Sequence, residues 1–275
     1  MATVPDVTRN AAGVAESNPE PLRRERDGRG VITLTLNRPQ SFNALSVSLL
    51  TALQAQLDAL ARDTSARVLV LAGAGKAFCA GHDLREMRAQ PSLADYQRLF
   101  AQCSRMMLSL LRLPIPVIAR VHGTATAAGC QLVAQCDLAV ASSEARFAVS
   151  GVKLGLFCST PAVALTRNVP RKAAFEMLVT GDFLDAAQAQ ACGLVNRVAP
   201  PAALDAEVEK LVASILAKPR TAIAMGKELF YRQAELGIEA AYEAAVQTIA
   251  CNMMDPAALE RVQAFIDKRP PHRGE

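Results

Sequence analysis

The sequence lacks any long apolar run and any block of like charge. No stretch approaches the roughly 20 apolar residues that cross a bilayer, so we expect no integral membrane protein. The net charge is +4 over 275 residues, and the Lys and Arg residues are scattered. This distribution argues against a nucleic-acid-binding protein. A mild positive excess would suit a small polyanionic ligand, and it is equally compatible with an ordinary solvated surface.

Paired cysteines and metal-ligand spacings are also missing. The seven cysteines are an odd number and contain no CxxC pair, which predicts a reducing compartment, and we expect the cytoplasm. The three histidines, 82, 122 and 272, lie too far apart for a metal site. Residues 1–24 lack the apolar core of a secretion signal and carry three acidic residues. We expect them to form a disordered polar tail.

What is present is an alternation of strand-like and helix-like segments. Residues 30–36 alternate apolar and Thr side chains before the turn at Pro39, which predicts a strand. Leu residues at helical spacing predict a helix capped by Asn43 and ending near residue 62. Short apolar runs at 67–72 and 116–121 predict strands buried on both faces. A helix beginning at Ser92 or Asp95 separates them. This order predicts an α/β fold with parallel pairing.

Strand signals stop at about residue 202. Four helices are predicted after it, separated by Pro and Gly breaks, at 204–217, 221–236, 238–253 and 256–268. We therefore expect a core at 25–201 and a helical subdomain at 202–275. The 51% hydrophobic content is enough for a substantial core.

Two loops after the buried strands are rich in small residues. The first runs from Gly73 to Leu84 and the second from Gly123 to Gln131, and each opens a helix. Two helix N-termini that face one point would offer unpaired amide hydrogens to an oxygen that gains negative charge. This is the requirement of an oxyanion hole for a thioester enolate. Either loop alone is weak evidence, since such turns often serve close packing.

Together these segments carry a family resemblance. LTLNRPQSFNAL, GKAFCAGHDLREM, the run from Pro116 to Gly155 and AFIDKRPP are similar to the crotonase, or enoyl-CoA hydratase/isomerase, family over residues 30–270. The resemblance implies a crotonase-like spiral of ββα units and a C-terminal helical region that builds trimers, commonly paired into hexamers. It also implies an acyl-CoA ligand and a role in fatty acid metabolism. Within the family, residues 129–142 and 151–181 are most similar to one subgroup.

The resemblance also assigns a binding role to several residues. The two oxyanion amides fall on His82 and on Ala128, where glycine is usual in the family. No permanently bound cofactor is implied, because coenzyme A enters as part of the thioester substrate. It would lie along the 38–45 turn and the 76–85 loop. The residues expected to contact it are Arg38, Ala80, Arg85 and Lys268, of which Arg85 and Lys268 match basic positions that meet its phosphates, although both could be solvated surface charges.

Two acid/base carboxylates of the family are replaced. Gln131 and Gly151 stand where the resemblance places the glutamates that hold and deprotonate water. Gln131 keeps the shape of a glutamate but takes no proton, and Gly151 has no side chain. We therefore expect hydration to be absent or feeble. In the loop that follows, Cys158 or Ser159 could face the acyl chain, although a buried Cys is more often structural.

His82 allows two interpretations. Its imidazole could move protons beside an acyl group, or only its backbone amide matters and a local hydrogen bond, for example with Asp83, holds the ring. Three functions stay open: an enzyme acting on a CoA thioester as hydratase, isomerase, decarboxylase or thioesterase; a non-catalytic acyl-CoA binding or regulatory protein; and a peptidase. The peptidase would need a Ser, His and Asp set in the right loops, which the sequence does not offer.

Overall fold

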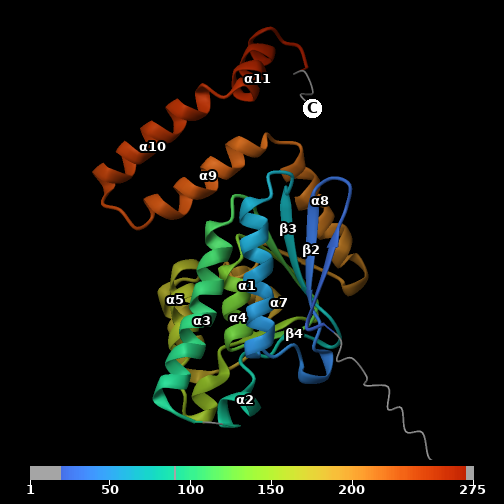
Figure 1. Cartoon of the computed structure of the whole chain (residues 1–275), viewed down its shortest axis with the longest axis vertical. Helices are drawn as coiled ribbons and strands as arrows, with labels where there is room; N and C mark the ends of the chain where they lie inside the picture. Colours follow the sequence, from blue (N-terminus) through green and yellow to red (C-terminus); the bar gives the residue numbers. More distant parts are fainter. Residues whose placement is uncertain (1–19, 90, 271–275) are drawn as a thin grey trace, which may run out of the picture.

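Two sheets form the body of the protein in this computed structural model, which describes residues 20–89 and 91–270 (Figure 1). The larger sheet has the strand order β1-β2-β3-β5-β7-β10, and the smaller has β4-β6-β8-β9. Neighbouring strands run parallel except in the β1–β2 and β8–β9 pairs. The larger sheet contains Leu22–Arg26, Val31–Leu36, Val68–Gly73, Val117–Val121, Leu138–Ser142 and Arg197–Ala199, and the smaller contains Ala77–Cys79, Thr124–Thr126, Arg146–Ala148 and Leu184–Asp185.

From β3 to β8, successive strands alternate between the two sheets, and a helix follows each pair. After β3 and β4 come α2 (Leu84–Ala89) and α3 (Leu93–Arg112), and after β5 and β6 comes α4 (Ala128–Gln135). After β7 and β8, a short 3₁₀ helix leads into α5 (Ser159–Asn168). This repetition confirms the predicted α/β spiral of ββα units. The ends of β4 and β6 thereby bring the two small-residue loops to the same region.

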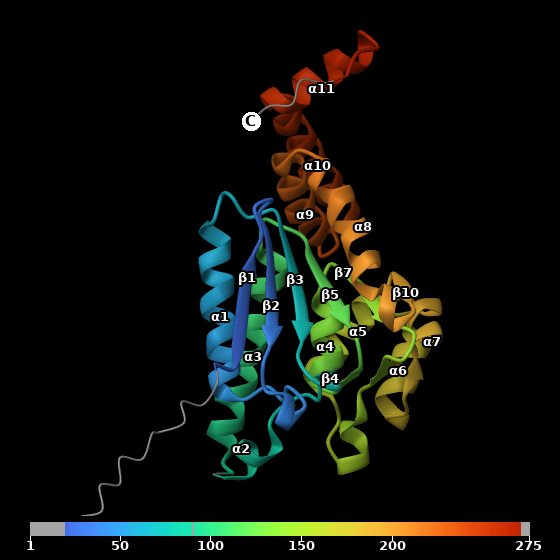
Figure 2. The same ribbon diagram turned by 90° about the vertical axis from the view of Figure 1, so that its right-hand side faces the viewer.

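The larger sheet is buried on both faces because each face has its own hydrophobic core. On one face, alternate residues of β2 such as Ile32 and Leu34 pack in the main core with α1 (Val47–Arg62) and α3. On the other face, Val68 and Val70 of β3 pack against α8 (Leu204–Leu216). Figure 2 shows α8 on one side of the sheet and α1 and α3 on the other. Buried apolar surface on both sides accounts for the continuous apolar run of β3.

The start of α1 differs from the prediction. Asn43 is not its cap: the N-cap is Ser46, whose side chain accepts a hydrogen bond from the Leu49 amide at 3.2 Å. Asn43 instead adopts a left-handed φ of 55°, a conformation that Asn tolerates better than most residues. For α3 the prediction was right, because Ser92 accepts from the Asp95 amide.

The N-terminal boundary also needs correction. Residues 22–24, expected to belong to the disordered tail, form part of β1, which pairs antiparallel with β2 from Leu22 to Arg26. The charged sequence of this strand hid it, because only Leu22 is buried. Ladder hydrogen bonds to β2, rather than apolar periodicity, order the segment. Glu20 and Pro21 are described too, and their carbonyls accept hydrogen bonds from Asn37, whereas residues 1–19 of the predicted tail lie outside the described residues.

The C-terminal arm, which we define as α9 (Arg220–Gln233), α10 (Ile238–Met253) and α11 (Pro256–Ile266), projects from the body (Figures 1 and 2). All four helices predicted after residue 202 are present. The arm leaves many large apolar side chains exposed, including Phe230, Ile238, Tyr242, Val246, Ile249, Met254, Phe265 and Ile266. Among the described residues, no helix is both long and apolar enough to span a bilayer.

Candidate active site

The first predicted amide lies in a segment that is fixed by the turn before α1. The Leu45 amide donates to the Gly81 carbonyl at 2.7 Å, and the Asp83 amide donates to the Leu45 carbonyl at 3.2 Å. The Ala80 amide donates to the Phe42 carbonyl at 3.0 Å. Within the described chain, the His82 amide donates no hydrogen bond. Its neighbours are therefore held while its own N–H stays available.

Asn43 joins this turn to the loop after β3. Its side chain is fully buried, and its Nδ2 donates to the carbonyls of Ala74 and Ala77, both at 2.8 Å. Its Oδ1 accepts from the Arg38 amide at 2.9 Å. Every polar atom of the Asn43 side chain is thus used to connect the two loops. Sequence reasoning missed this role of Asn43. The available signal for it was the position of the Asn just after a turn that contains proline.

The second predicted amide begins α4. Ala127, the residue before it, has φ 51° and ψ −123°, a conformation that favours glycine. The Ala127 amide donates to the Ala148 carbonyl at 2.9 Å, which ties this strained turn to β8. The Ala128 amide has no hydrogen-bond acceptor among the residues that the structure describes.

Gly81 brings the two amide-bearing segments into contact. Its φ is +93°, and a Cβ at this position would lie 2.9 Å from the Ala127 Cβ and 3.2 Å from the Ala128 nitrogen. Only glycine fits both the backbone conformation and the space. The segments carrying the His82 and Ala128 amides therefore touch. Such an arrangement can present two unpaired N–H groups to one oxygen, as the sequence predicted.

The positions of the two missing carboxylates lie in α4 and in the short 3₁₀ helix after β8. Gln131 lies in the first turn of α4, is 4% exposed, and has an Oε1 atom that is buried without a hydrogen-bond partner. Gly151 follows Ser150, whose hydroxyl lies 2.8 Å from the hydroxyl of Thr126 at the end of β6. The Thr126–Ser150 contact was not foreseen. It ties the β8 end, and with it Gly151, to the turn that leads into α4.

Cys158 packs directly on Gly151. A Cβ at Gly151 would lie 2.7 Å from the Cys158 Sγ and 2.7 Å from the Leu156 carbonyl oxygen. The thiol is buried, which raises its pKa and keeps it protonated at neutral pH. Cys158 therefore occupies the space beside Gly151 as a neutral group. It lies beside the candidate site but is not a thiolate, and its suggested contact with the acyl chain stays a prediction.

The ring of His82 is buried among neutral groups. It packs edge-on against Phe100 of α3, with ring centroids 5.3 Å apart, and neither ring nitrogen has a hydrogen-bond partner in the described chain. The suggested hydrogen bond with Asp83 was wrong, because Asp83 accepts from Arg38 instead. Burial lowers the pKa of His82 to about 4, and it outweighs the Leu45 backbone, which acts in the opposite direction. The imidazole is neutral at pH 7 and holds no proton to donate as an imidazolium.

The neutral His82 predicts acid sensitivity. Its pKa is about 4 in the fold, against an ordinary value of 6.5, so the unfolded chain binds the extra proton first. The stabilisation is complete above pH 6.5 and is lost as the pH falls toward 4, at most about 3 kcal/mol. We expect urea midpoints of the wild type to fall faster between pH 6.5 and 4.5 than those of His82→Gln. Parallel pH profiles of the two proteins would contradict this.

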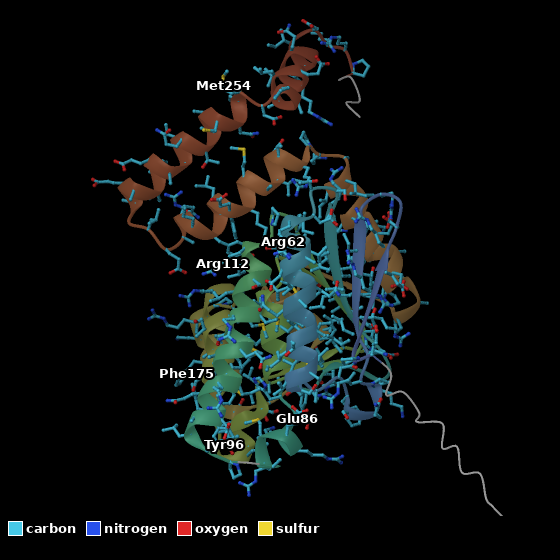
Figure 3. All side chains as sticks on the ribbon, in the orientation of Figure 1. Arg62, Glu86, Tyr96, Arg112, Phe175 and Met254 are labelled. Atoms are coloured by element: carbon cyan, nitrogen blue, oxygen red, sulfur yellow. The ribbon has the colours of Figure 1, made fainter. Side chains whose placement is uncertain are left out.

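The basic residues expected to contact coenzyme A are distributed unevenly. Arg38 donates to Asp83 at 2.9 Å and to the Ala44 carbonyl at 2.6 Å, so it joins the two loops. Arg85 lies at the exposed start of α2 near the site. Lys268 follows α11, at the end of the molecule opposite to α2. In Figure 3, Met254 marks the end with α11 and Glu86 marks the end with α2. Within one chain, therefore, Lys268 is not brought to the site.

His122 has a structural contact. Its Nε2 lies 2.9 Å from the Gly75 carbonyl oxygen. The third histidine, His272, lies outside the described residues. No cluster of three or more His, Cys, Asp or Glu side chains suited to a metal ion occurs within residues 20–89 and 91–270.

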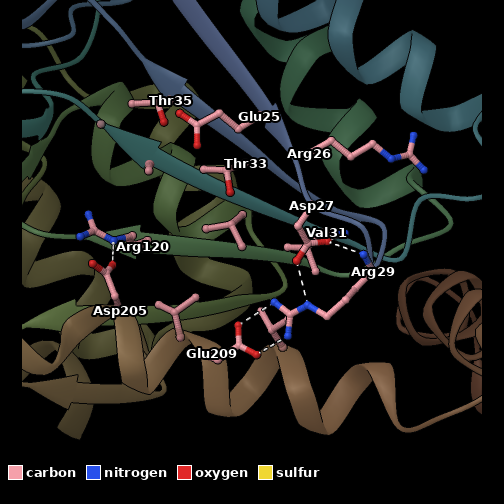
Figure 4. A pocket seen from close by; sticks show the side chains of 15 residues that line it. Glu25, Arg26, Asp27, Arg29, Val31, Thr33, Thr35, Arg120, Asp205 and Glu209 are labelled. Carbon is pink, nitrogen blue, oxygen red and sulfur yellow. Dashed lines mark hydrogen bonds and ion pairs between the residues drawn. The ribbon is translucent and has the colours of Figure 1, made fainter.

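Two surface cavities lie away from these residues. One, of about 480 Å³, runs between the larger sheet and α8, where Arg29 pairs with Asp27 and Glu209, and Arg120 with Asp205 (Figure 4). The other, of about 530 Å³, lies on α6 (Arg171–Thr180) around Phe175. Neither contains a predicted site residue. The candidate site is therefore defined by its backbone amides and by Gln131, not by either of these cavities.

Comparison with known proteins supports one family. The family model described as enoyl-CoA hydratase/isomerase matches residues 26–275. The mouse (Mus musculus) protein named enoyl-CoA hydratase domain-containing protein 3, mitochondrial, is 40% identical over 95% of this chain and 87% of its own length. A solved structure of an enoyl-CoA hydratase from Mycobacterium smegmatis is 65% identical with a TM-score of 0.91, covering 92% of this chain and 98% of that one.

The subgroup indicated by residues 129–181 is confirmed as well. The crystal structure of human enoyl-CoA hydratase domain-containing protein 3 has a TM-score of 0.88 and is 39% identical, covering 92% of this chain and all of that one. Similarity therefore extends over nearly the whole chain and is not limited to one contiguous region.

Proposed function

The chain belongs to the enoyl-CoA hydratase/isomerase family, and on that basis we propose that it binds an acyl-CoA thioester whose carbonyl oxygen accepts hydrogen bonds from the His82 and Ala128 amides. The observation that carries the proposal is the contact at Gly81 between two segments with unused amides. Fixed N–H donors stabilise the enolate that forms when charge develops on the thioester oxygen. Both donors belong to backbone segments that neighbouring hydrogen bonds hold in place, so the backbone needs little reorganisation when the thioester binds.

The side chains around this site limit the chemistry. Gln131 can form hydrogen bonds but transfers no proton, His82 is neutral, and the Cys158 thiol stays protonated. Hydration of an enoyl thioester by two carboxylates is therefore expected to be feeble. The protein would act as an enzyme with an altered reaction on a CoA thioester in fatty acid metabolism. The second candidate is a non-catalytic acyl-CoA binding protein, which is favoured because neither Gln131 nor Gly151 has a side chain that transfers a proton.

A binding and turnover panel separates these candidates. The purified full chain is incubated with enoyl-, malonyl- and saturated acyl-CoA thioesters, while affinity is measured by calorimetry and products by mass spectrometry. Turnover supports the enzyme, and tight binding without turnover supports the binding protein. If none of these thioesters binds, the proposed ligand class is wrong.

One glycine variant tests the oxyanion site itself. Gly81→Ala would push a methyl group against the Ala128 nitrogen, and it should abolish the red shift that a polarised carbonyl produces in the absorbance of bound cinnamoyl-CoA. Gly193→Ala is a matched control, because Gly193 also has a left-handed φ, of +80°, but only the Asn168 carbonyl lies near it. An unchanged red shift in Gly81→Ala would place the thioester elsewhere.

We also propose self-association as a trimer or a dimer of trimers through the C-terminal arm. The arm exposes a large apolar surface, which monomeric proteins rarely do. A second copy would also allow Lys268, distant from its own site, to reach a neighbour's site and meet the coenzyme A phosphates beside Arg85. Such ion contacts would weaken as salt is raised.

Phe265→Asp is expected to break this assembly. Phe265 is 85% exposed at the end of α11, and a charge there would have to be buried in an apolar interface. Light scattering after size exclusion should then give the mass of one chain. Leu93→Asp is the control, because Leu93 is 75% exposed on the body rather than on the arm. An unchanged mass for Phe265→Asp would remove α11 from the interface.

A reducing location is the last part of the proposal. All seven cysteines are free, and five of them are buried. Free buried thiols support the predicted reducing compartment, and we keep the cytoplasm as the proposed location.

A further inference from the structure

The direction of the His82 N–H is tied to a hydrogen bond on the opposite side of its peptide unit. The Gly81–His82 peptide is trans and planar, so the Gly81 carbonyl and the His82 N–H point in opposite directions. The Leu45 amide donates to this carbonyl at 2.7 Å. Because the carbonyl is held toward Leu45, the His82 N–H points away from the turn before α1. The orientation of this amide therefore depends on where Leu45 lies.

The turn that carries Leu45 has a backbone that needs support. Phe42 and Asn43 both have left-handed φ angles, of 50° and 55°, which cost free energy unless the surrounding structure holds them. Phe42 is 55% exposed, whereas the Asn43 side chain, two residues before Leu45, is fully buried. Asn43 is therefore the residue whose side chain can hold this turn in place.

The carboxamide of Asn43 holds the turn against the loop that leads to His82. Its Nδ2 donates to the carbonyls of Ala74 and Ala77, which lie on either side of the connection between β3 and β4. Ala77 begins β4, and His82 follows shortly after that strand ends. A Cβ at Gly73 would lie 3.0 Å from this Nδ2, so the carboxamide has little room to move. One side chain thus fixes the turn relative to the start of β4.

We propose that Asn43 is a positioning residue: its carboxamide sets the orientation of the His82 N–H, and with it the degree to which a bound thioester carbonyl is polarised. The inference rests on the proposed acyl-CoA function. Asn43 acts through Leu45 and the Gly81 carbonyl, not by contact with the ligand. Hydrogen bonds weaken steeply as their angle departs from linear. Rotation of this one peptide unit therefore lowers the polarisation of the carbonyl while most binding contacts stay in place.

Two Asn43 variants of the full chain test this role. Asn43→Asp keeps the acceptor for the Arg38 amide, but it turns an oxygen instead of a donor toward the Ala74 and Ala77 carbonyls and repels them. We expect the absorbance red shift of bound cinnamoyl-CoA to fall at least by half. Affinity measured by calorimetry should change less than about ten-fold, the net contribution of one hydrogen bond. Asn43→Gly removes the carboxamide but still adopts a left-handed φ without strain, and it should separate polarisation from affinity in the same way.

Asn168→Asp is the matched control. The Nδ2 atom of Asn168 also donates to two carbonyls, those of Ala134 and Ala164, at 2.9 and 2.8 Å. Asn168 lies at the end of α5, outside both small-residue loops. The same loss of two donated hydrogen bonds should therefore leave the red shift of bound cinnamoyl-CoA at its wild-type value.

The outcomes separate this inference from the proposed function. A wild type that does not bind cinnamoyl-CoA, or binds it without a red shift, would contradict the proposed oxyanion site itself. A wild-type red shift that both Asn43 variants keep in full would overturn the positioning role. An equal loss of the red shift in Asn168→Asp would overturn it as well. Circular dichroism checks that each variant folds, and if neither Asn43 variant folds, the carboxamide serves folding and the positioning role is wrong.

Discussion

Asp137→Asn is expected to lower the free energy of unfolding by about 3–5 kcal/mol. Asp137 Oδ2 accepts from the buried Lys227 ammonium and from the Val117 amide, both at 2.6 Å, and Oδ1 accepts from the Tyr231 hydroxyl at 2.6 Å. Removing the carboxylate charge leaves the Lys227 cation buried without a counter-charge. Burial already lowers the pKa of Lys227, against the opposing effect of Asp137. Urea unfolding followed by circular dichroism measures the loss.

The same network attaches the C-terminal arm to the body. Lys227 and Tyr231 lie on α9, and Lys227 also donates to the carbonyls of Leu110 and Ile115 at 2.9 and 3.0 Å. The matched control is Asp182→Asn, which breaks the exposed Lys153–Asp182 ion pair and should cost less than about 1 kcal/mol. Equal losses of unfolding free energy in the two variants would contradict the expectation that the buried Asp137 network stabilises the protein more than an exposed ion pair does.

Restoring both carboxylates is expected to restore hydration only when Cys158 is also changed. In Gln131→Glu, Gly151→Glu, the new side chain at 151 would place its Cβ 2.7 Å from both the Cys158 Sγ and the Leu156 carbonyl oxygen. Adding Cys158→Ala removes the sulfur atom. The Leu156 carbonyl can move away because the loop around Gly155 is exposed and has open space beside it. We expect this triple variant to hydrate crotonyl-CoA about 10²–10⁴ times faster than the wild type, the usual contribution of general acid–base catalysis.

The controls isolate the carboxylates. The Gly151→Glu, Cys158→Ala variant keeps Gln131 and should stay near the wild-type rate, and the variant with both glutamates but intact Cys158 should be at least ten-fold slower than the triple. Rates follow from the loss of the enoyl absorbance. A triple variant that binds crotonyl-CoA without hydrating it would show that the missing carboxylates do not explain a feeble hydratase activity.

Local periodicity predicted three strands of the larger sheet, β2, β3 and β5, and the helices α1, α3 and α8 to α11. Alternation in β2, the apolar run of β3 and the Pro and Gly breaks after residue 202 each report burial or backbone conformation over a few neighbouring residues, which sequence patterns record directly. The charged strand β1 escaped because its order comes from pairing with β2. The Asn43 cap was wrong because a tertiary contact, not the helix, uses that side chain.

By itself the sequence determined the α/β alternation of the core, the helical C-terminal region, the two small-residue loops and the identities of Gln131 and Gly151, and its family resemblance implied the spiral. Only the tertiary structure decided that Gly81 touches Ala128, that Cys158 fills the space beside Gly151, and that Lys227 meets Asp137 from 90 residues away. It also decided that Lys268 lies far from its own site. Local patterns encode which residues are buried, whereas packing between distant segments decides what each buried residue meets.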